Sequence, residues 1–320
     1  MDTGDIDYLY ERGMDSLKIN DLDAAIRDFA GIIRIDPENV DAHFQRGVAY
    51  ALKFDHDAAI RDFHVAISLN PHSAHFFQAR GNMYQFAGNL DAAFADFNET
   101  IRLDPGIAAA YVSRGKIYAQ RRELDSAIVD LSEAIRLDQA NVEAYVWRGS
   151  SFLDRGALDA AIRDLGEALR LDPHQITART LRGVAYHRKN MLAEALQDFS
   201  AAINQDVTCI DAFYHRGQLY YRRFMQSANP ADLEWAIADF SAVIRLKPDL
   251  VKAHIARGMG YFEQRDFQSA VRDFSEAIHL EPDNARLYRY RGDAHGALGD
   301  QNAARRDYAE VELLERMGKK

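Results

Sequence analysis

The chain has 320 residues, of which 48% are hydrophobic and 28% are charged, and this balance excludes an intrinsically disordered chain. Its net charge of −10 argues against nucleic acid as the main partner, because phosphate binding depends on lysine and arginine. No stretch has the roughly 18 consecutive apolar residues of a membrane-spanning helix, so we expect no membrane partner.

Arginine followed by glycine recurs at a fixed spacing along the whole chain. The spacing is 34 residues six times, then 41, then 34. A period of this size is the signature of stacked structural repeats. We therefore expect a single array over residues 1–320, with repeats at about 6–39, 40–73, 74–107, 108–141, 142–175, 176–209, 210–250, 251–284 and 285–318.

Each repeat carries the pattern of two amphipathic helices. In the second repeat, apolar residues recur every three or four positions, which predicts one helix over 42–52 and another over 57–69. The glycine, and an alanine twelve positions after it, are small enough to let the two helices approach closely. In most repeats, aromatic residues or leucine three and sixteen positions after the glycine fill the space between neighbouring repeats, and a proline twenty-four positions after it ends the second helix.

The seventh repeat is seven residues longer than the others, with the insertion at Met225 to Ala231. Asn229 followed by Pro230, with acidic residues in the next turn, indicates a fresh helix start. Phe224 and Met225, if exposed, would make this segment a second contact surface. Tolerated length variation is the alternative interpretation.

These columns resemble the tetratricopeptide repeat, in which Gly, Tyr, Ala, Phe and Pro recur within a 34-residue unit. The resemblance implies an all-α fold, a right-handed superhelical solenoid of tandem helix-turn-helix repeats. It also implies that the first helices line a concave groove, which holds an extended peptide or a helix of a partner. Several features depart from the family pattern: arginine precedes the glycine where the family has leucine, the proline column fails at Gln139 and Val207, and Arg305 of the last repeat stands in an apolar column.

An aspartate stands fifteen residues after the glycine in eight of the nine predicted repeats and, beyond the seven-residue insertion, twenty-two after it in the seventh, always together with the arginine. We interpret the two as an ion pair that joins the two helices of one repeat, because a binding site rarely needs nine identical copies. A charged ladder for a ligand is the alternative. The aspartates are Asp28, Asp62, Asp96, Asp130, Asp164, Asp198, Asp239, Asp273 and Asp307.

By analogy with the family, the groove-facing positions lie six, three and two residues before the glycine and one, four and five after it. From these positions we expect partner contacts at Phe44, Asn82, Trp147, His187, Arg188, Tyr214, His215, Tyr221, Arg222, Lys252, Arg286 and Arg289. Arginine and tyrosine are frequent binding anchors, and here they gather in the late repeats. The late groove is therefore expected to hold a partner segment that is acidic or ends in a C-terminal carboxylate; a solvated face without preference is the alternative.

Family members that clamp the C-terminal carboxylate of chaperones use lysine and asparagine on successive first helices. The matching positions of the first repeat hold Tyr10 and Met14, so a chaperone-tail clamp is not expected.

Nothing in the sequence indicates an enzyme, a cofactor or a resident metal. Each glycine stands alone in a helical pattern, so no phosphate-binding loop is expected, and the one cysteine, Cys209, lacks a histidine partner in its register. His43, His72 and His75 come nearest to a metal cluster but lack the usual cysteine ligands. One cysteine excludes an intrachain disulfide, and the acidic N-terminus lacks a secretory signal, so we expect a cytoplasmic protein.

The leading hypothesis is a protein-interaction module or scaffold without catalysis. The alternative is a self-associating structural scaffold, a homo-oligomer built through the last repeat and its Leu313, Leu314 and Met317.

Overall fold

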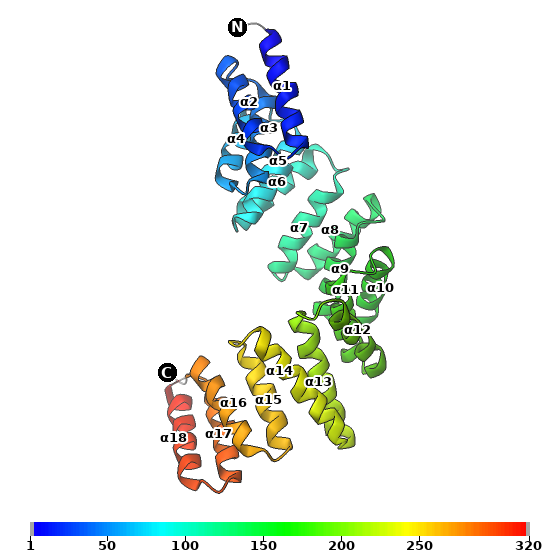
Figure 1. Ribbon diagram of the computed structural model, residues 1–320. Helices are drawn as coiled ribbons and strands as arrows, with labels where there is room; N and C mark the ends of the chain where they lie inside the picture. Colours follow the sequence, from blue (N-terminus) through cyan, green and yellow to red (C-terminus); the bar gives the residue numbers. More distant parts are fainter. Residues whose placement is uncertain (1–2, 318–320) are drawn as a thin grey trace. The chain divides into compact units, whose positions relative to one another are not determined.

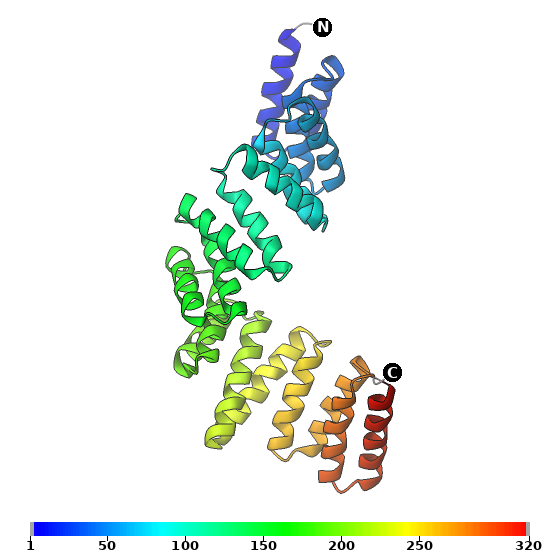
Figure 2. The ribbon, with the colours of Figure 1, turned by 180° about the vertical axis from the view of Figure 1, so that it is seen from behind.

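The computed structural model describes residues 3–317, and these form eighteen α-helices and no strand. The chain divides into two compact units, Met1–Ala157 and Leu158–Lys320. Within each unit, every helix packs against the helix that follows it, and Figures 1 and 2 show the successive helices lying side by side. The predicted all-α repeat fold is confirmed, whereas the repeat boundaries stay predictions.

The helices of the first unit are α1 (Thr3–Lys18), α2 (Leu22–Ile35), α3 (Val40–Leu52), α4 (His56–Leu69), α5 (Ala74–Phe86), α6 (Leu90–Leu103), α7 (Ala108–Gln120), α8 (Leu124–Leu137) and α9 (Val142–Arg155). Those of the second unit are α10 (Leu158–Leu171), α11 (Ile176–Arg188), α12 (Leu192–Gln205), α13 (Ile210–Ser227), α14 (Pro230–Leu246), α15 (Val251–Glu263), α16 (Phe267–Leu280), α17 (Ala285–Ala297) and α18 (Gln301–Met317). The two helices predicted for the second repeat correspond to α3 and α4.

Helix ends follow local side-chain chemistry. The Oδ1 atom of Asp55 accepts a hydrogen bond from the backbone N–H of Ala58 at 3.0 Å and caps α4. Asn229 caps α14 through the N–H of Ala231 at 3.2 Å, and Pro230 occupies the first turn. The helix start predicted in the insertion is therefore confirmed.

Each packing glycine lets two helices of one pair approach closely. A Cβ atom at Gly258 would lie 2.7 Å from Cε1 of Phe274, too close for any side chain. Phe274 and the neighbouring Ala270 are buried at this contact between α15 and α16. The same close approach recurs between Gly183 and Phe199.

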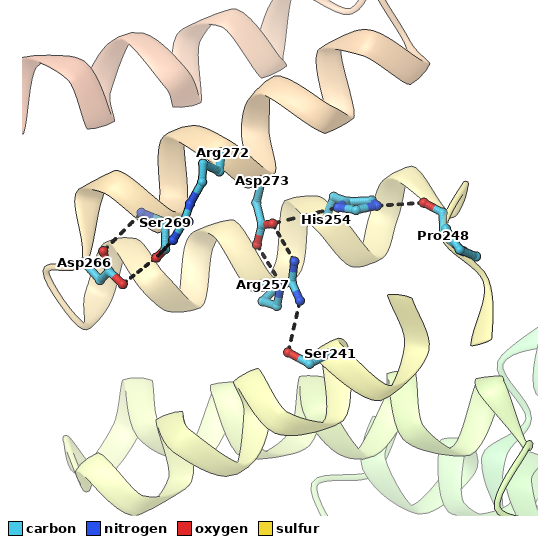
Figure 3. Close-up of polar contacts among 8 residues, drawn as sticks. All are labelled: Ser241, Pro248, His254, Arg257, Asp266, Ser269, Arg272 and Asp273. Carbon is cyan, nitrogen blue, oxygen red and sulfur yellow. Dashed lines mark hydrogen bonds and ion pairs between the residues drawn. The ribbon is translucent and has the colours of Figure 1, made fainter. Parts of the chain in front are cut away.

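The arginine–aspartate pair ties the two helices of each pair together, as Figure 3 shows for Arg257 and Asp273. Nε of Arg257 donates to one carboxylate oxygen of Asp273 at 2.8 Å, and Nη2 donates to the other at 2.7 Å. The aspartate is buried, and bidentate, charge-assisted bonds of this kind are strong. Eight of the nine predicted pairs have both members inside one unit, and all eight make these bonds. In these eight, the predicted link between helices is confirmed.

The remaining nitrogen of the guanidinium group, Nη1, bonds to the second helix of the preceding pair. Nη1 of Arg257 donates to Oγ of Ser241 on α14 at 3.2 Å (Figure 3). At six junctions a side chain of the preceding helix accepts this bond, and it stands seventeen positions after the packing glycine, or twenty-four in the repeat with the insertion; these acceptors are His64, Asn98, Ser132, Ser200, Ser241 and Ser275. One guanidinium therefore holds three helices, and a polar column missed in the sequence analysis completes the contact.

The seven-residue insertion is helical rather than a protruding loop. It lengthens α13 and α14, which have 18 and 17 residues, whereas α15 has 13 and α16 has 14. Met225 is exposed as expected, but Phe224 is half-buried. The expectation of an exposed Phe224 was wrong.

Candidate functional site

The early members of the predicted groove are engaged within their own helices or in packing between neighbours. The ring of Phe44 packs between Phe63 and Phe76, with centroid distances of 5.4 and 4.8 Å. Oδ1 of Asn82 accepts a hydrogen bond from Gln78 one turn earlier at 3.1 Å. These contacts give both side chains a structural role in the first unit.

Trp147 on α9 is half-buried against the core formed with α8. The ammonium group of Lys116 lies 5.6 Å from the centroid of its indole ring and also pairs with Glu143 at 2.8 Å. The surface around Trp147 therefore combines an aromatic ring with a cation that is already paired.

The second unit brings five predicted groove residues together around one cavity of about 410 Å³ between α11, α13 and α15. We call it the late-groove cavity; the five residues are His187, Tyr214, Tyr221, Arg222 and Lys252. Its remaining lining was not singled out from the sequence and consists of Gln218, Phe240, Ile255, Ala256 and Met259. The cavity thus has an apolar floor and a polar rim that carries two cations.

Lys252 and Arg222 are exposed at the rim of this cavity, and among the described residues neither forms an ion pair with an acid. Nζ of Lys252 lies 4.3 Å from the ring centroid of Tyr214, a cation–π contact that holds the lysine over the cavity. Tyr214 in turn packs against Phe240 with centroids 5.9 Å apart. The two positive charges are thus held beside apolar surface and are open to an anionic group.

The surroundings of two histidines in this region lower their pKa values. Burial, and next the charge of Arg222, lowers the pKa of His187. Burial also lowers the pKa of His215, whose ring stacks on Phe199 with centroids 5.9 Å apart. His215 does not line the cavity; its Nδ1 lies 3.1 Å from Oε1 of Gln218, so it positions the Gln218 amide that does.

A second, smaller cavity of about 210 Å³ adjoins the first between α13, α15 and α17. It shares Tyr221 and Met259 with the late-groove cavity, and its other lining residues are Phe262, Glu263, Phe274, Tyr290 and Asp293. Burial, followed by the charge of Glu263, raises the pKa of Tyr221 to about 12. This α15–α17 cavity was not anticipated from the sequence.

The three remaining arginines of the predicted set lie outside both cavities. Arg188 and Arg286 are exposed on α11 and α17. Nη2 of Arg289 pairs with Glu315 on α18 at 2.9 Å. The cationic part of the groove is therefore narrower than the sequence suggested and centres on Arg222 and Lys252.

The candidate metal ligands take up separate positions. His43 is buried, with Nε2 3.0 Å from the carbonyl oxygen of Pro37, while His72 and His75 are exposed. Within residues 3–317, no group of three or more His, Cys, Asp or Glu side chains is arranged to hold a metal ion. In the same part of the chain, no helix combines the length and the apolar character that crossing a membrane requires.

Comparison with known proteins places these features in a family context. A family model described as "TPR repeat" matches residues 115–154 and 149–190, and one described as "Tetratricopeptide repeat" matches residues 10–74 and 255–317. Together these segments cover more than half of the chain. No curated protein matches the chain significantly.

Solved structures of helical repeat proteins share the fold. The Cut9–Hcn1 hetero-tetramer of the APC/C matches with a TM-score of 0.63 at 18% identity, over 90% of this chain and 54% of that chain. A tetratricopeptide repeat protein from Parabacteroides merdae matches with a TM-score of 0.60 at 17% identity, over 80% of this chain and 99% of that chain. At this identity the likeness concerns the fold alone.

Proposed function

Because the chain belongs to the tetratricopeptide repeat family, whose members are generally protein-interaction scaffolds, we propose that it binds a partner protein, without catalysis, through the inner face of its first helices. The partner contributes an extended peptide or a helix, and the late-groove cavity is its principal anchor point.

The observation that carries this proposal is the pairing of an apolar floor with two unsatisfied cations in one cavity. Phe240 and Ile255 offer a dry surface for an apolar side chain. Arg222 and Lys252 stand beside it without an acidic partner among the described residues. A cavity of about 410 Å³ with a few convergent polar groups falls within the usual range of ligand pockets, about 300–1,000 Å³.

The charge of the rim selects an acidic segment or a C-terminal carboxylate. An anion placed there is attracted by two cations close to a low-dielectric surface, where the attraction is screened less than in water. It also favours protonation of His187, whose pKa is lowered in the free protein. Binding of such a segment is therefore expected to strengthen as the pH is lowered into the range where His187 becomes protonated.

Fluorescence anisotropy with short peptides, end-blocked except where stated, tests this proposal. One labelled peptide carries a phenylalanine and two glutamates, a second has glutamines in place of the glutamates, and a third has the glutamine sequence with a free C-terminal carboxylate. We expect the acidic or the free-carboxylate peptide to bind about fivefold or more tightly than the blocked glutamine peptide.

A charge-reversed protein supplies the second half of the test. The variant Arg222→Glu with Lys252→Glu is expected to lose this preference, and Arg305→Glu with Arg306→Glu, which makes the same change in charge on exposed positions of α18, is expected to keep it. A preference that survives in the first variant would show that the anion is not held in the late-groove cavity.

The self-associating scaffold remains a second candidate, favoured by the outer surface of α18. Leu313 is 50% exposed and Met317 64% exposed there, whereas Leu314 is half-buried. Light scattering over a range of concentrations decides between the candidates, because an assembly built through α18 grows with concentration and is reversed by Leu313→Glu.

A further inference from the structure

We propose that the two adjoining cavities of the second unit recognise a partner segment of mixed charge, with an acidic side chain at one end and a basic side chain at the other. Apolar side chains between them fill the two cavities. This inference rests on the proposed function and adds a requirement that a simple acidic-peptide site lacks.

The two cavities form one composite surface because they have a common wall. Tyr221 of α13 and Met259 of α15 line both of them. The thioether of Met259 is adaptable, so this wall fits apolar side chains of different shape. A bound segment that enters one cavity therefore passes directly over the other.

The charge changes sign across this wall. The late-groove cavity carries Arg222 and Lys252 at its rim, whereas the α15–α17 cavity carries Glu263 and Asp293. Glu263 is exposed at the end of α15, and no ion pair of its carboxylate occurs within residues 3–317.

Asp293 is only partly engaged. Its Oδ1 atom accepts a hydrogen bond from the hydroxyl of Tyr308 at 2.8 Å, so Oδ2 is left to face a ligand. The floor of this cavity is apolar, through Phe262 and Phe274. Each cavity therefore joins apolar surface to one sign of charge, and the two signs are opposite.

The distance between the cavities sets the spacing of the recognised residues. α13 and α15 are in contact, and packed helices lie about 8–10 Å apart. A segment in the polyproline II conformation advances about 3.1 Å per residue and has three residues per turn, so side chains three positions apart lie on one face and can reach adjacent cavities. The expected pattern is an acid next to an apolar residue, two spacers, and then an apolar residue next to a base.

Four labelled peptides with blocked ends test this inference by fluorescence anisotropy. All contain Phe-Ser-Ser-Leu; they are flanked by Glu and Lys, by Glu and Glu, by Lys and Lys, or by Gln and Gln. We expect the Glu/Lys peptide to bind about fivefold more tightly than the Glu/Glu peptide, because the second glutamate faces Glu263 and Asp293. The preference should weaken as salt is added.

A variant of the acidic cavity provides the matched test. Glu263→Lys is favourable at the C-terminus of α15, and Asp293→Asn keeps an acceptor for Tyr308, so the double variant is expected to fold. It should bind the Glu/Glu peptide more tightly than the Glu/Lys peptide, reversing the wild-type order.

The outcomes separate this inference from the proposed function. If the Glu/Glu and Glu/Lys peptides bind equally and both exceed the Gln/Gln peptide, the mixed-charge inference is wrong and the acidic-segment proposal stands. If the Lys/Lys peptide binds as tightly as the Glu/Lys peptide, both are wrong, because the late-groove cavity then does not select an acid. An unchanged order in the double variant also overturns the inference.

Discussion

The arginine that holds three helices together lacks one of its partners at the junction of α10 and α11. Arg182 bonds to Asp198 in the usual way, but the position that supplies an acceptor at six other junctions is Gly166. A Cβ atom at Gly166 would meet only Nη1 of Arg182, at 3.8 Å. The substitution Gly166→Ser therefore places a hydroxyl where Ser241 stands beside Arg257 (Figure 3).

The expected gain in the free energy of unfolding has two parts. Glycine inside a helix is about 1 kcal/mol worse than alanine, and serine about 0.5 kcal/mol worse, so propensity contributes about 0.5 kcal/mol. A hydrogen bond contributes about 0.5–1.5 kcal/mol, and the 23% exposure of the Arg182 side chain points to the lower half of that range. We expect Gly166→Ser to stabilise the second unit by about 1 kcal/mol.

Alanine at the same position separates the two parts. Gly166→Ala raises the free energy of unfolding through helix propensity alone, by about 1 kcal/mol. The serine and alanine variants are therefore expected to be about equally stable. The reverse substitution, Ser200→Ala, removes a bond that Arg216 donates at 3.2 Å and should likewise be nearly neutral.

Urea unfolding followed by circular dichroism measures these differences, with transition midpoints compared because repeat proteins depart from two-state behaviour. If the serine variant at 166 is about 0.5 kcal/mol less stable than the alanine variant, propensity alone acts. The arginine bond then contributes nothing, and the reasoning is refuted.

Three further outcomes follow from the structure. Gly258→Ala should destabilise the fold by about 1–3 kcal/mol, since its Cβ would lie 2.7 Å from Phe274. Gly296→Ala, with open space around it, should stabilise the fold by about 1 kcal/mol. Melting temperatures that shift in the same direction for both variants would contradict this. Phe54→Gly should stabilise by about 1 kcal/mol, because Phe54 is exposed at a φ of 61° that costs a side chain energy; a lower midpoint in urea would count against it. The pKa of Tyr221 in the folded state is about 12, so its contribution to stability is present below pH 10 and is lost as the pH rises towards 12. When phenolate absorbance is titrated, the step at the highest pH should be absent in Tyr221→Phe.

The backbone was largely predictable because each repeat restates the same constraints. The positions of α3 and α4, the bonds of the arginine–aspartate pair and the helix start at Pro230 all follow from residue types at fixed offsets. Residue type marks only some of the left-handed turns. Phe54, Arg122 and Arg265 adopt a left-handed conformation, as Gly88 does, although their side chains disfavour it. There the packing of the two helices fixes the turn and overrides local preference.

The candidate site was predictable in its location but not in its composition. The first helices α11, α13 and α15 come in order, so the groove positions of consecutive repeats were expected to meet, and five of them do. Met259 and Gln218 occupy the same offsets but were passed over, because selection by charge and aromaticity ignores the apolar floor. Phe240 belongs to a second helix, and its place in the floor depends on how closely α14 packs, which no single column reveals.

Arginine serves two separate purposes in the second unit, and the offset from the packing glycine distinguishes them. Arg257, immediately before its glycine, is bonded to Asp273 and Ser241, so reversing its charge would leave a buried aspartate unpaired and destabilise the fold. Arg222, five positions after its glycine, is exposed and lines a cavity. Reversing its charge should therefore change the free energy of unfolding by no more than about 0.5 kcal/mol. A loss of binding is therefore evidence for a contact with the partner only at the second kind of position. At the first kind, the same loss reports unfolding.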